Sequence, residues 1–272
     1  IYGFVYDGLY SPDEFYFDPT QNFLAVPNEG TVINTIYQDS NSGAATLPGK
    51  IKFKDLDGDG QITENDRTVI GNTTPKFQGG FGLSGQWKNF DFTANFNYMV
   101  DFDVYNATNY MLSSSISNTN NFYNVLADFT QKNRWTYVRA DGECLYKNTN
   151  IDGSVNEYIT MNAGKSLWNP ADVEDKVTHS YFVEDGSFLR LQDVTIGYTL
   201  PSNLTKKWGM SKVRFYASAS NLFILTGYSG YDPEVDVQSG LTPSMDYNRY
   251  PRSRSFVFGL SLIHISEPTR RS

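Results

Sequence analysis

The sequence contains few of the residues on which most enzymatic sites depend. Its 272 residues include one cysteine, Cys144, which excludes an intramolecular disulfide framework and any zinc site built from cysteines. Neither of the two histidines, His179 and His264, accompanies a G-x-S-x-G or an H-E-x-x-H motif. We therefore expect a protein that is not an enzyme, with no catalytic residues and no redox or nucleotide cofactor.

Charge and long apolar runs are also scarce. Charged residues make up 19% of the chain and the net charge is -8, so we expect no nucleic-acid partner. No segment reaches the 18 apolar residues of a membrane helix, but membrane-crossing strands are apolar only at every second position. The first residue, Ile1, follows no initiator methionine or signal segment, so we expect part of a longer protein. An aromatic share of 15% favours β structure.

Alternation of apolar and polar residues predicts a β-hairpin near the middle of the chain. From Phe90 to Val104 every even position is apolar, and nearly every odd position is polar. The segment Phe77 to Trp87 alternates in the same way, and only Lys88-Asn89 separates the two runs. Because a two-residue link joins antiparallel neighbours, we expect strands over both segments.

A second hairpin and a final strand are predicted further along. Phe188 to Leu200 alternates with a phase slip near Asp193, which indicates a bulge, and a short link leads to the strand from Val213 to Leu225. The final strand carries on one face Phe256, Phe258, Leu260 and Leu262. Short links thus fall at one end of the strands and long loops at the other, as in outer-membrane barrels. A soluble β-sandwich also alternates, and the pattern alone leaves both open.

An aspartate-rich loop has the spacing of a calcium site. Residues 55–66 match D-x-D-x-D-G-x₅-E, with aspartate in place of the final glutamate. Ca²⁺ prefers six to eight oxygen ligands. The loop offers the carboxylates and the carbonyl of Asp55, Asp57, Asp59, Asp66 and Gln61. These residues indicate either a structural Ca²⁺ site or a series of Asx-turns held by backbone amides without a metal.

The flanks of this loop differ from those of a paired EF-hand. Gly49 to Phe53 alternates like a strand where an entering helix is required, Ile62 is expected to point inward, and Thr63 and Asp66 have capping-box spacing. Elsewhere, Asp232-Pro233-Glu234 predicts an ordinary turn.

The order of several segments carries a family resemblance. The segments are Tyr6 to Tyr10 (YDGLY), Asp55 to Gly71 (DLDGDGQITENDRTVIG) with the hairpin after it, Asn133-Arg134-Trp135, Val183 to Pro201 (VEDGSFLRLQDVTIGYTLP), Asn221-Leu222-Phe223, Gly230 to Glu234 (GYDPE) and Tyr250 to Leu262 (YPRSRSFVFGLSL). In this order they resemble the C-terminal part of the SusC/RagA family of TonB-dependent outer-membrane transporters of Bacteroidota.

The resemblance implies an all-β fold: the C-terminal strands and extracellular loops of a 22-stranded antiparallel outer-membrane β-barrel that this chain is too short to close. Residues 1–262 then belong to the barrel, with residues 256–262 in its C-terminal assembly strand. The tail 263–272 breaks the alternation, puts His264 where an aromatic is expected, and is expected to be non-native.

The implied function is import of glycans or peptides across the cell outer membrane. The implied partners are a SusD-like surface lipoprotein, outer-membrane lipid and the TonB complex, which acts through a plug and TonB box that we do not find in this chain. The alternative is a secreted, calcium-stabilised β-sandwich that binds carbohydrate. No substrate-binding residue is assigned from the sequence.

Overall fold

A computed structural model describes most of the chain. The described residues are 1–21, 24–36, 46–114, 116–117, 121–122, 124–137, 146–147, 150–151, 155–170, 177–235, 243–247, 250 and 252–264, so Cys144 lies outside them. The chain divides into two compact units. We call Ile1–Asn72 with Tyr105–Val183 the loop unit, and Thr73–Val104 with Glu184–Ser272 the sheet unit.

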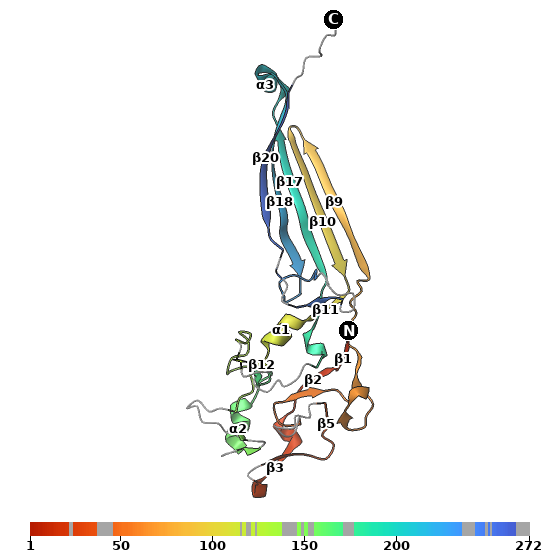
Figure 1. Ribbon diagram of the computed structural model, residues 1–272, viewed down its shortest axis with the longest axis vertical. Helices are drawn as coiled ribbons and strands as arrows, with labels where there is room; N and C mark the ends of the chain where they lie inside the picture. Colours follow the sequence, from red (N-terminus) through yellow and green to blue (C-terminus); the bar gives the residue numbers. More distant parts are fainter. Residues whose placement is uncertain are drawn as a thin grey trace. The chain divides into compact units, whose positions relative to one another are not determined.

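The sheet unit is built on five long antiparallel strands that lie side by side (Figure 1). In the order of the sheet they are β20 (Ser255–His264), β18 (Met210–Thr226), β17 (Phe188–Thr199), β10 (Phe90–Val100) and β9 (Phe77–Trp87). Among these five strands, each one pairs with the strand that comes next along the chain. Both predicted hairpins and the final strand are therefore confirmed.

The connections differ in length between the two ends of the sheet. At one end, Lys88-Asn89 joins β9 to β10, and Lys88 takes the left-handed φ of 54° that such tight loops require. At the same end, helix α3 (Ser202–Thr205) and the 3₁₀ turn η6 (Lys206–Trp208) join β17 to β18. The long connections, which follow β10 and β18, leave from the opposite end. The predicted asymmetry of short and long links is confirmed.

Two details of the strands depart from simple alternation. In the pairing of β10 with β17, Asn95 faces Asp193 and Phe96 faces Leu191, so Gln192 is an extra residue and the predicted bulge is confirmed. The predicted end of the strand at Val104 is wrong, because β10 ends at Val100.

The backbone explains the early end of β10. Asp101 takes a φ of 63°, which breaks the ladder. Beyond it, Phe102 and Val104 are buried in a cluster with Phe188 and Tyr228. The chain continues as β11 (Asp103–Asn106), which lies between β16 (Val183–Asp185) and β19 (Met245–Asp246) in a separate three-stranded sheet.

The loop unit consists of short elements. Its strands are β1 (Tyr2–Gly3), β2 (Tyr6–Leu9), β3 (Phe15–Asp18), β4 (Leu24–Pro27), β5 (Ile33–Asn34), β6 (Ile51–Phe53), β7 (Gln61–Ile62), β8 (Thr68–Val69), β12 (Ile116–Ser117), β13 (Asn121–Phe122), β14 (Tyr146–Lys147) and β15 (Asn150–Ile151). Its helices are α1 (Ala107–Leu112) and α2 (Val155–Asn162), with 3₁₀ turns η1 (Pro12–Glu14), η2 (Pro19–Gln21), η3 (Glu64–Asp66) and η5 (Ser180–Phe182). Among the described residues, no helix has the length and hydropathy needed to cross a membrane.

Aromatic side chains hold these short elements together. The main core of the loop unit includes Phe4, Phe53, Trp168 and Phe182, each with at most 2% of its surface exposed. Buried aromatic side chains contribute large apolar areas, which suits a unit with few long elements. His179 is buried among them and stacks on the ring of Tyr6.

Candidate functional site

The aspartate loop is anchored at both ends by buried residues. Strand β6 enters it with Ile51 and Phe53 buried, and β7 leaves it with Ile62 fully buried in the same core. The expectations of an entering strand and of an inward-pointing Ile62 are confirmed. The 3₁₀ turn η3 follows, capped by Thr63. The loop between these anchors is therefore held at a fixed span.

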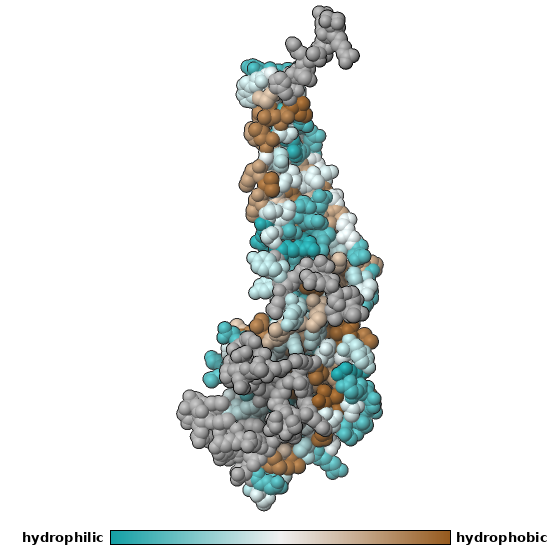
Figure 2. Space-filling view, in the orientation of Figure 1, coloured by the Kyte–Doolittle hydropathy of each residue, from teal (hydrophilic) through white to brown (hydrophobic). Residues whose placement is uncertain are grey.

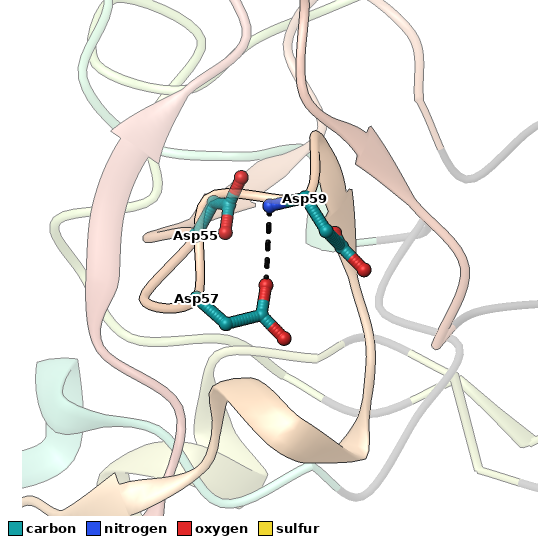
Figure 3. Close-up of side chains that lie close together, drawn as sticks. All are labelled: Asp55, Asp57 and Asp59. Carbon is teal, nitrogen blue, oxygen red and sulfur yellow. Dashed lines mark hydrogen bonds between the residues drawn. The ribbon is translucent and has the colours of Figure 1, made fainter.

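Three carboxylates gather within the loop (Figure 3). One oxygen each from Asp55, Asp57 and Asp59 lies within 4.8 Å of the other two. The turn depends on Gly58 and Gly60, whose φ values of 78° and 82° place them in the left-handed region. Such a group of oxygens is the kind of ligand set that Ca²⁺ prefers.

The same carboxylates accept backbone hydrogen bonds. Asp55 accepts from the N–H groups of Gly58 (2.6 Å) and Gly60 (2.9 Å), and Asp57 accepts from the N–H of Asp59 (3.2 Å) (Figure 3). The hydrogen bond from the N–H of Gly60, and to a smaller extent the one from Gly58, holds the pKa of Asp55 below its ordinary value. These hydrogen bonds hold the carboxylates of Asp55 and Asp57 in place, which is compatible with both interpretations of the loop.

The remaining two predicted ligands lie outside this carboxylate group. Asp66 is fully buried and accepts from the N–H groups of Leu56 (2.8 Å) and Thr63 (2.7 Å), so it closes the loop as the capping-box residue of η3. The spacing of Thr63 and Asp66 correctly predicted this turn. Gln61 begins β7, and its N–H donates to Asp59. Calcium binding by the five residues stays a prediction.

The five-stranded sheet has two chemically different faces. Residues directly opposite each other on neighbouring strands point to the same face. The register therefore defines an apolar face, made of Phe77, Phe81, Leu83, Trp87, Phe90, Phe92, Ala94, Phe96, Tyr98, Val100, Leu189, Leu191, Val194, Ile196, Tyr198, Val213, Phe215, Ala217, Ala219, Phe223, Leu225, Phe256, Phe258, Leu260 and Leu262, with Gly79 and Gly85. It contains no charged residue.

Much of this apolar face is exposed. Phe77 has 66% of its surface accessible and Phe258 has 81%. Figure 2, coloured by hydropathy, shows apolar residues at the surface of the sheet. The four predicted apolar residues of the last strand all lie on this face, paired with β18. The strand continues past Leu262, since Ile263 faces Lys212 and His264 faces Met210.

The opposite face, which we call the polar face, carries ion pairs and hydroxyl groups. Arg214 on β18 reaches across β17 to Asp91 on β10, with its Nε 2.9 Å from one carboxylate oxygen and its Nη2 bonded to the other. Gly197 lies beneath them, and a Cβ there would come within 2.4 Å of Arg214 and 2.6 Å of Asp91. Nearby, the hydroxyls of Thr195 and Ser218 are 2.8 Å apart. Glycine therefore makes room for an ion pair that ties three strands together.

A group of four charged residues, of which two are buried, was missed by the sequence analysis. Arg190 on β17 is 4% exposed and bonds Asp232 at 2.5 Å, and its Nε lies 3.5 Å from Glu234. Arg252 lies 2.9 Å from the other oxygen of Glu234. We call Arg190, Asp232, Glu234 and Arg252 the ionic tetrad. Arg190 is 42 residues from Asp232 in sequence, so the Asp232-Pro233-Glu234 segment looked like an ordinary turn.

The tetrad fixes a long connection of the sheet unit. Asp232 and Glu234 lie in the segment after β18, while Arg190 belongs to β17. A buried carboxylate without its cation is costly, so the pairs hold this segment against the strand. In the same segment, Tyr228 is buried and donates to Asp246 of β19 at 2.7 Å.

Comparison with known proteins identifies relatives along nearly the whole chain. No family model matches it. TonB-dependent receptor P3 of Formosa agariphila is 33% identical over 268 residues, which are 96% of this chain and 22% of that protein. TonB-dependent receptor SusC of Bacteroides thetaiotaomicron is 29% identical over 212 residues, 77% of this chain and 17% of SusC.

The solved structures agree on the fold. The RagAB peptide transporter matches 96% of this chain and 22% of its own chain, with a TM-score of 0.60 and 20% identity. The RagAB peptide importer in its 'open-open' state gives a TM-score of 0.55 at 21% identity. The chain spans about a fifth of the length of the relatives it matches. Sequence, register and fold together show that this chain belongs to the family of SusC/RagA-like TonB-dependent receptors.

Proposed function

We propose that this chain forms part of the wall and surface loops of a nutrient importer in the outer membrane of a Bacteroidota-like Gram-negative bacterium. The observation that carries the proposal is the sheet with one wholly uncharged apolar face and one polar face. Outer-membrane barrels place such an apolar face against lipid and the polar face toward the lumen.

Aromatic residues support a specific placement in the membrane. Trp87, Phe90, Tyr198 and Phe215 face one another in register across four strands, next to the short connections. Barrels carry such aromatic girdles where lipid chains meet the headgroups, and their short turns face the periplasm. The long connections, including the loop unit, then lie outside the cell.

The cargo and partners follow from the family. The receptor takes up glycans or peptides, works with a SusD-like surface lipoprotein and draws energy from the TonB complex through parts of the receptor outside this chain. The relatives are named as receptors and a transporter, and we propose that this protein likewise transports without a catalytic step.

The alternative, a secreted β-sandwich, has less support. A sandwich buries its apolar face beneath a second sheet. In the described part of the chain, the apolar face instead leaves Phe77, Phe258 and Ile196 more than half exposed. In an outer-membrane barrel, membrane lipid contacts this apolar face instead.

Fractionation of the full-length receptor tests the proposal. We expect it in the outer membrane, co-purifying with a lipoprotein. For topology, Glu64→Cys is introduced with Cys144→Ser, and intact cells are treated with a membrane-impermeant maleimide. Glu64 is exposed in the loop unit, so labelling is expected. Lys207→Cys, also exposed but within the short connection between β17 and β18, is the control that stays unlabelled. Recovery of the receptor as a soluble protein contradicts the proposal.

We also propose that the aspartate loop binds Ca²⁺ in a structural role, with Asp55, Asp57 and Asp59 as its core ligands. The gathering of their oxygens within 4.8 Å supports this, and extracellular Ca²⁺ suits a weak site. Calcium is expected to raise the thermal midpoint of the receptor, and Asp57→Asn with Asp59→Asn to abolish the rise. An equal midpoint with calcium and with chelator argues for the Asx-turn interpretation.

The last strand is proposed to guide barrel assembly through its apolar residues Phe256, Phe258, Leu260 and Leu262. Replacing residues 263–272 with an ordinary aromatic-terminated strand end is expected to raise the yield of assembled receptor if this tail is non-native.

A further inference from the structure

A pocket of about 620 Å³ lies entirely within the loop unit. Strand β2 and the start of η1 form one side, and the last residues of α2 with the turn from Ala163 to Leu167 form another. Its volume falls within the range of small-molecule sites, about 300 to 1,000 Å³. It is separate from the aspartate loop, which contributes no residue to its lining.

Aromatic rings make up much of the wall. Tyr6 and Tyr181 pack edge to face with ring centroids 5.0 Å apart, and both line the pocket with Tyr10 and Trp135. The hydroxyl of Tyr10 donates to the carbonyl of Val32 at 2.8 Å, and the indole N–H of Trp135 donates to Tyr158 at 2.8 Å. Tyr10 has no exposed surface and Trp135 only 4%, so these two rings support the wall from behind, and the rings of Tyr6 and Tyr181 are the ones that a ligand can reach.

Lys165 brings an uncompensated positive charge to this wall. It is half-buried in the pocket lining, and among the described residues its ammonium group has no carboxylate within ion-pair distance. Burial lowers the pKa of Lys165, and the positive charge of Arg134 lowers it further by a smaller amount. Arg134 adjoins the pocket through a bridge to Leu167, and its buried Nε has no hydrogen-bond partner in the described structure.

The position of Lys165 is fixed by the end of α2. The side chain of Asn162 is buried and bonds the N–H and carbonyl of Thr136 and the carbonyl of Tyr158. The N–H of Lys165 donates to the carbonyl of Asn162 at 3.2 Å. The one carboxylate in the lining, Asp13, is exposed, so solvent and salt screen it more than they screen the half-buried lysine. An anionic group is therefore favoured beside Lys165.

We propose that this pocket binds a sugar residue that carries a carboxylate, with tyrosine rings against the C–H face of the sugar and Lys165 paired with the carboxylate. A pyranose ring has one apolar face and a polar rim, which match aromatic rings bordered by the hydroxyls of Ser11 and Ser166. The assignment rests on the proposed function, since it names an acidic glycan as a ligand of the importer's surface loops.

The test measures binding to the full-length receptor, purified from outer membranes with its lipoprotein partner. The probes are trimers of glucuronate and of galacturonate, their carboxyl-reduced neutral counterparts, and triglutamate as an acidic peptide. Lys165→Met removes the charge, Lys165→Arg keeps it, and Lys132→Met is the matched control, because Lys132 is exposed and outside the pocket. Tyr181→Leu removes a ring without changing charge.

We expect at least one uronate trimer to bind more tightly than its neutral counterpart. Lys165→Met is expected to lower the affinity for that trimer about tenfold or more, since the lost contact is charge-assisted. Its affinity for the neutral counterpart is expected to stay within about twofold of the unchanged receptor's. Tyr181→Leu is expected to weaken the binding of both the acidic and the neutral trimer, and Lys132→Met is expected to change the binding of neither.

Other outcomes overturn the assignment. These are equal binding of acidic and neutral sugars, an unchanged affinity in Lys165→Met, preference for triglutamate, or no binding by any probe. Each leaves the proposed import function standing if the receptor is still found in the outer membrane with its lipoprotein. Failure of that localisation, in contrast, removes the function itself.

Discussion

An arginine placed at the middle of the apolar face measures directly whether that face meets lipid. Val194 on β17 lies on this face, opposite Ala94 and Ala219. It is four residues from Tyr198 in the aromatic row. At about 3.4 Å per residue and a strand tilt near 40°, those residues cover about 10 Å along the membrane normal. This is close to half of an apolar band about 25 Å tall, so Val194 lies near the midplane.

The expected cost follows from that depth. Arginine on the lipid face at the midplane of a barrel destabilises it by about 2 to 4 kcal/mol. The matched control is Thr195→Arg, one residue along the same strand but on the polar face. It loses the bond between Thr195 and Ser218, worth about 1 kcal/mol, and leaves the new charge in the lumen.

The assay compares denaturant unfolding of the full-length receptor variants in lipid vesicles, with the yield of assembled receptor in cells as a second readout. Val194→Leu controls for the change in side-chain volume. We expect Val194→Arg to be clearly the least stable of the three. Equal effects of Val194→Arg and Thr195→Arg, or the reverse order, would refute the assignment of this face to lipid.

Three further outcomes are expected. Arg190→Met leaves Asp232 buried without its cation and is expected to destabilise the segment after β18 by about 3 to 5 kcal/mol, seen as faster hydrogen exchange there, whereas Arg252→Met at the partly exposed edge costs about 1 kcal/mol or less. Burial lowers the pKa of His179 from 6.5 to about 4, so stability is full above about pH 6.5 and falls by about 3 kcal/mol as the pH drops to about 4, because unfolding then takes up a proton. His179→Leu is expected to remove that slope in thermal unfolding across this range, and an unchanged slope assigns it to other groups. In isothermal titration calorimetry, Asp57→Asn is expected to weaken calcium binding about tenfold or more, and identical heats in both proteins count against the metal site.

The strands were predictable because their signal is local. Alternation from Phe77 to Trp87 and the two-residue link after it define a hairpin without reference to any other part of the chain. The same local signal misplaced the end of β10. Phe102 and Val104 continue the alternation, but the left-handed backbone at Asp101 turns them into a buried cluster. Periodicity reports which residues are apolar, and it does not report which surface covers them.

The candidate sites show the same limit. The capping turn at Thr63 and the inward Ile62 follow from spacing within a dozen residues, and both were predicted. The ionic tetrad and the pocket were not, because each joins segments more than 40 residues apart through tertiary folding. Single charged residues such as Arg190 and Lys165 look like ordinary surface residues until their burial and neighbours are known.

The placement of the long insertion between β10 and β17 has a consequence for how such receptors diversify. These two strands are neighbours in the sheet, so the chain that leaves one and returns to the other starts and finishes at adjacent points of a fixed ladder. Doubling the length of a segment closed in this way costs only about 0.6 kcal/mol in chain entropy. The insertion can therefore lengthen or shorten at little cost to the strand ladder, as long as it keeps Trp168 and Phe182 in the core that they share with Phe4 and Phe53.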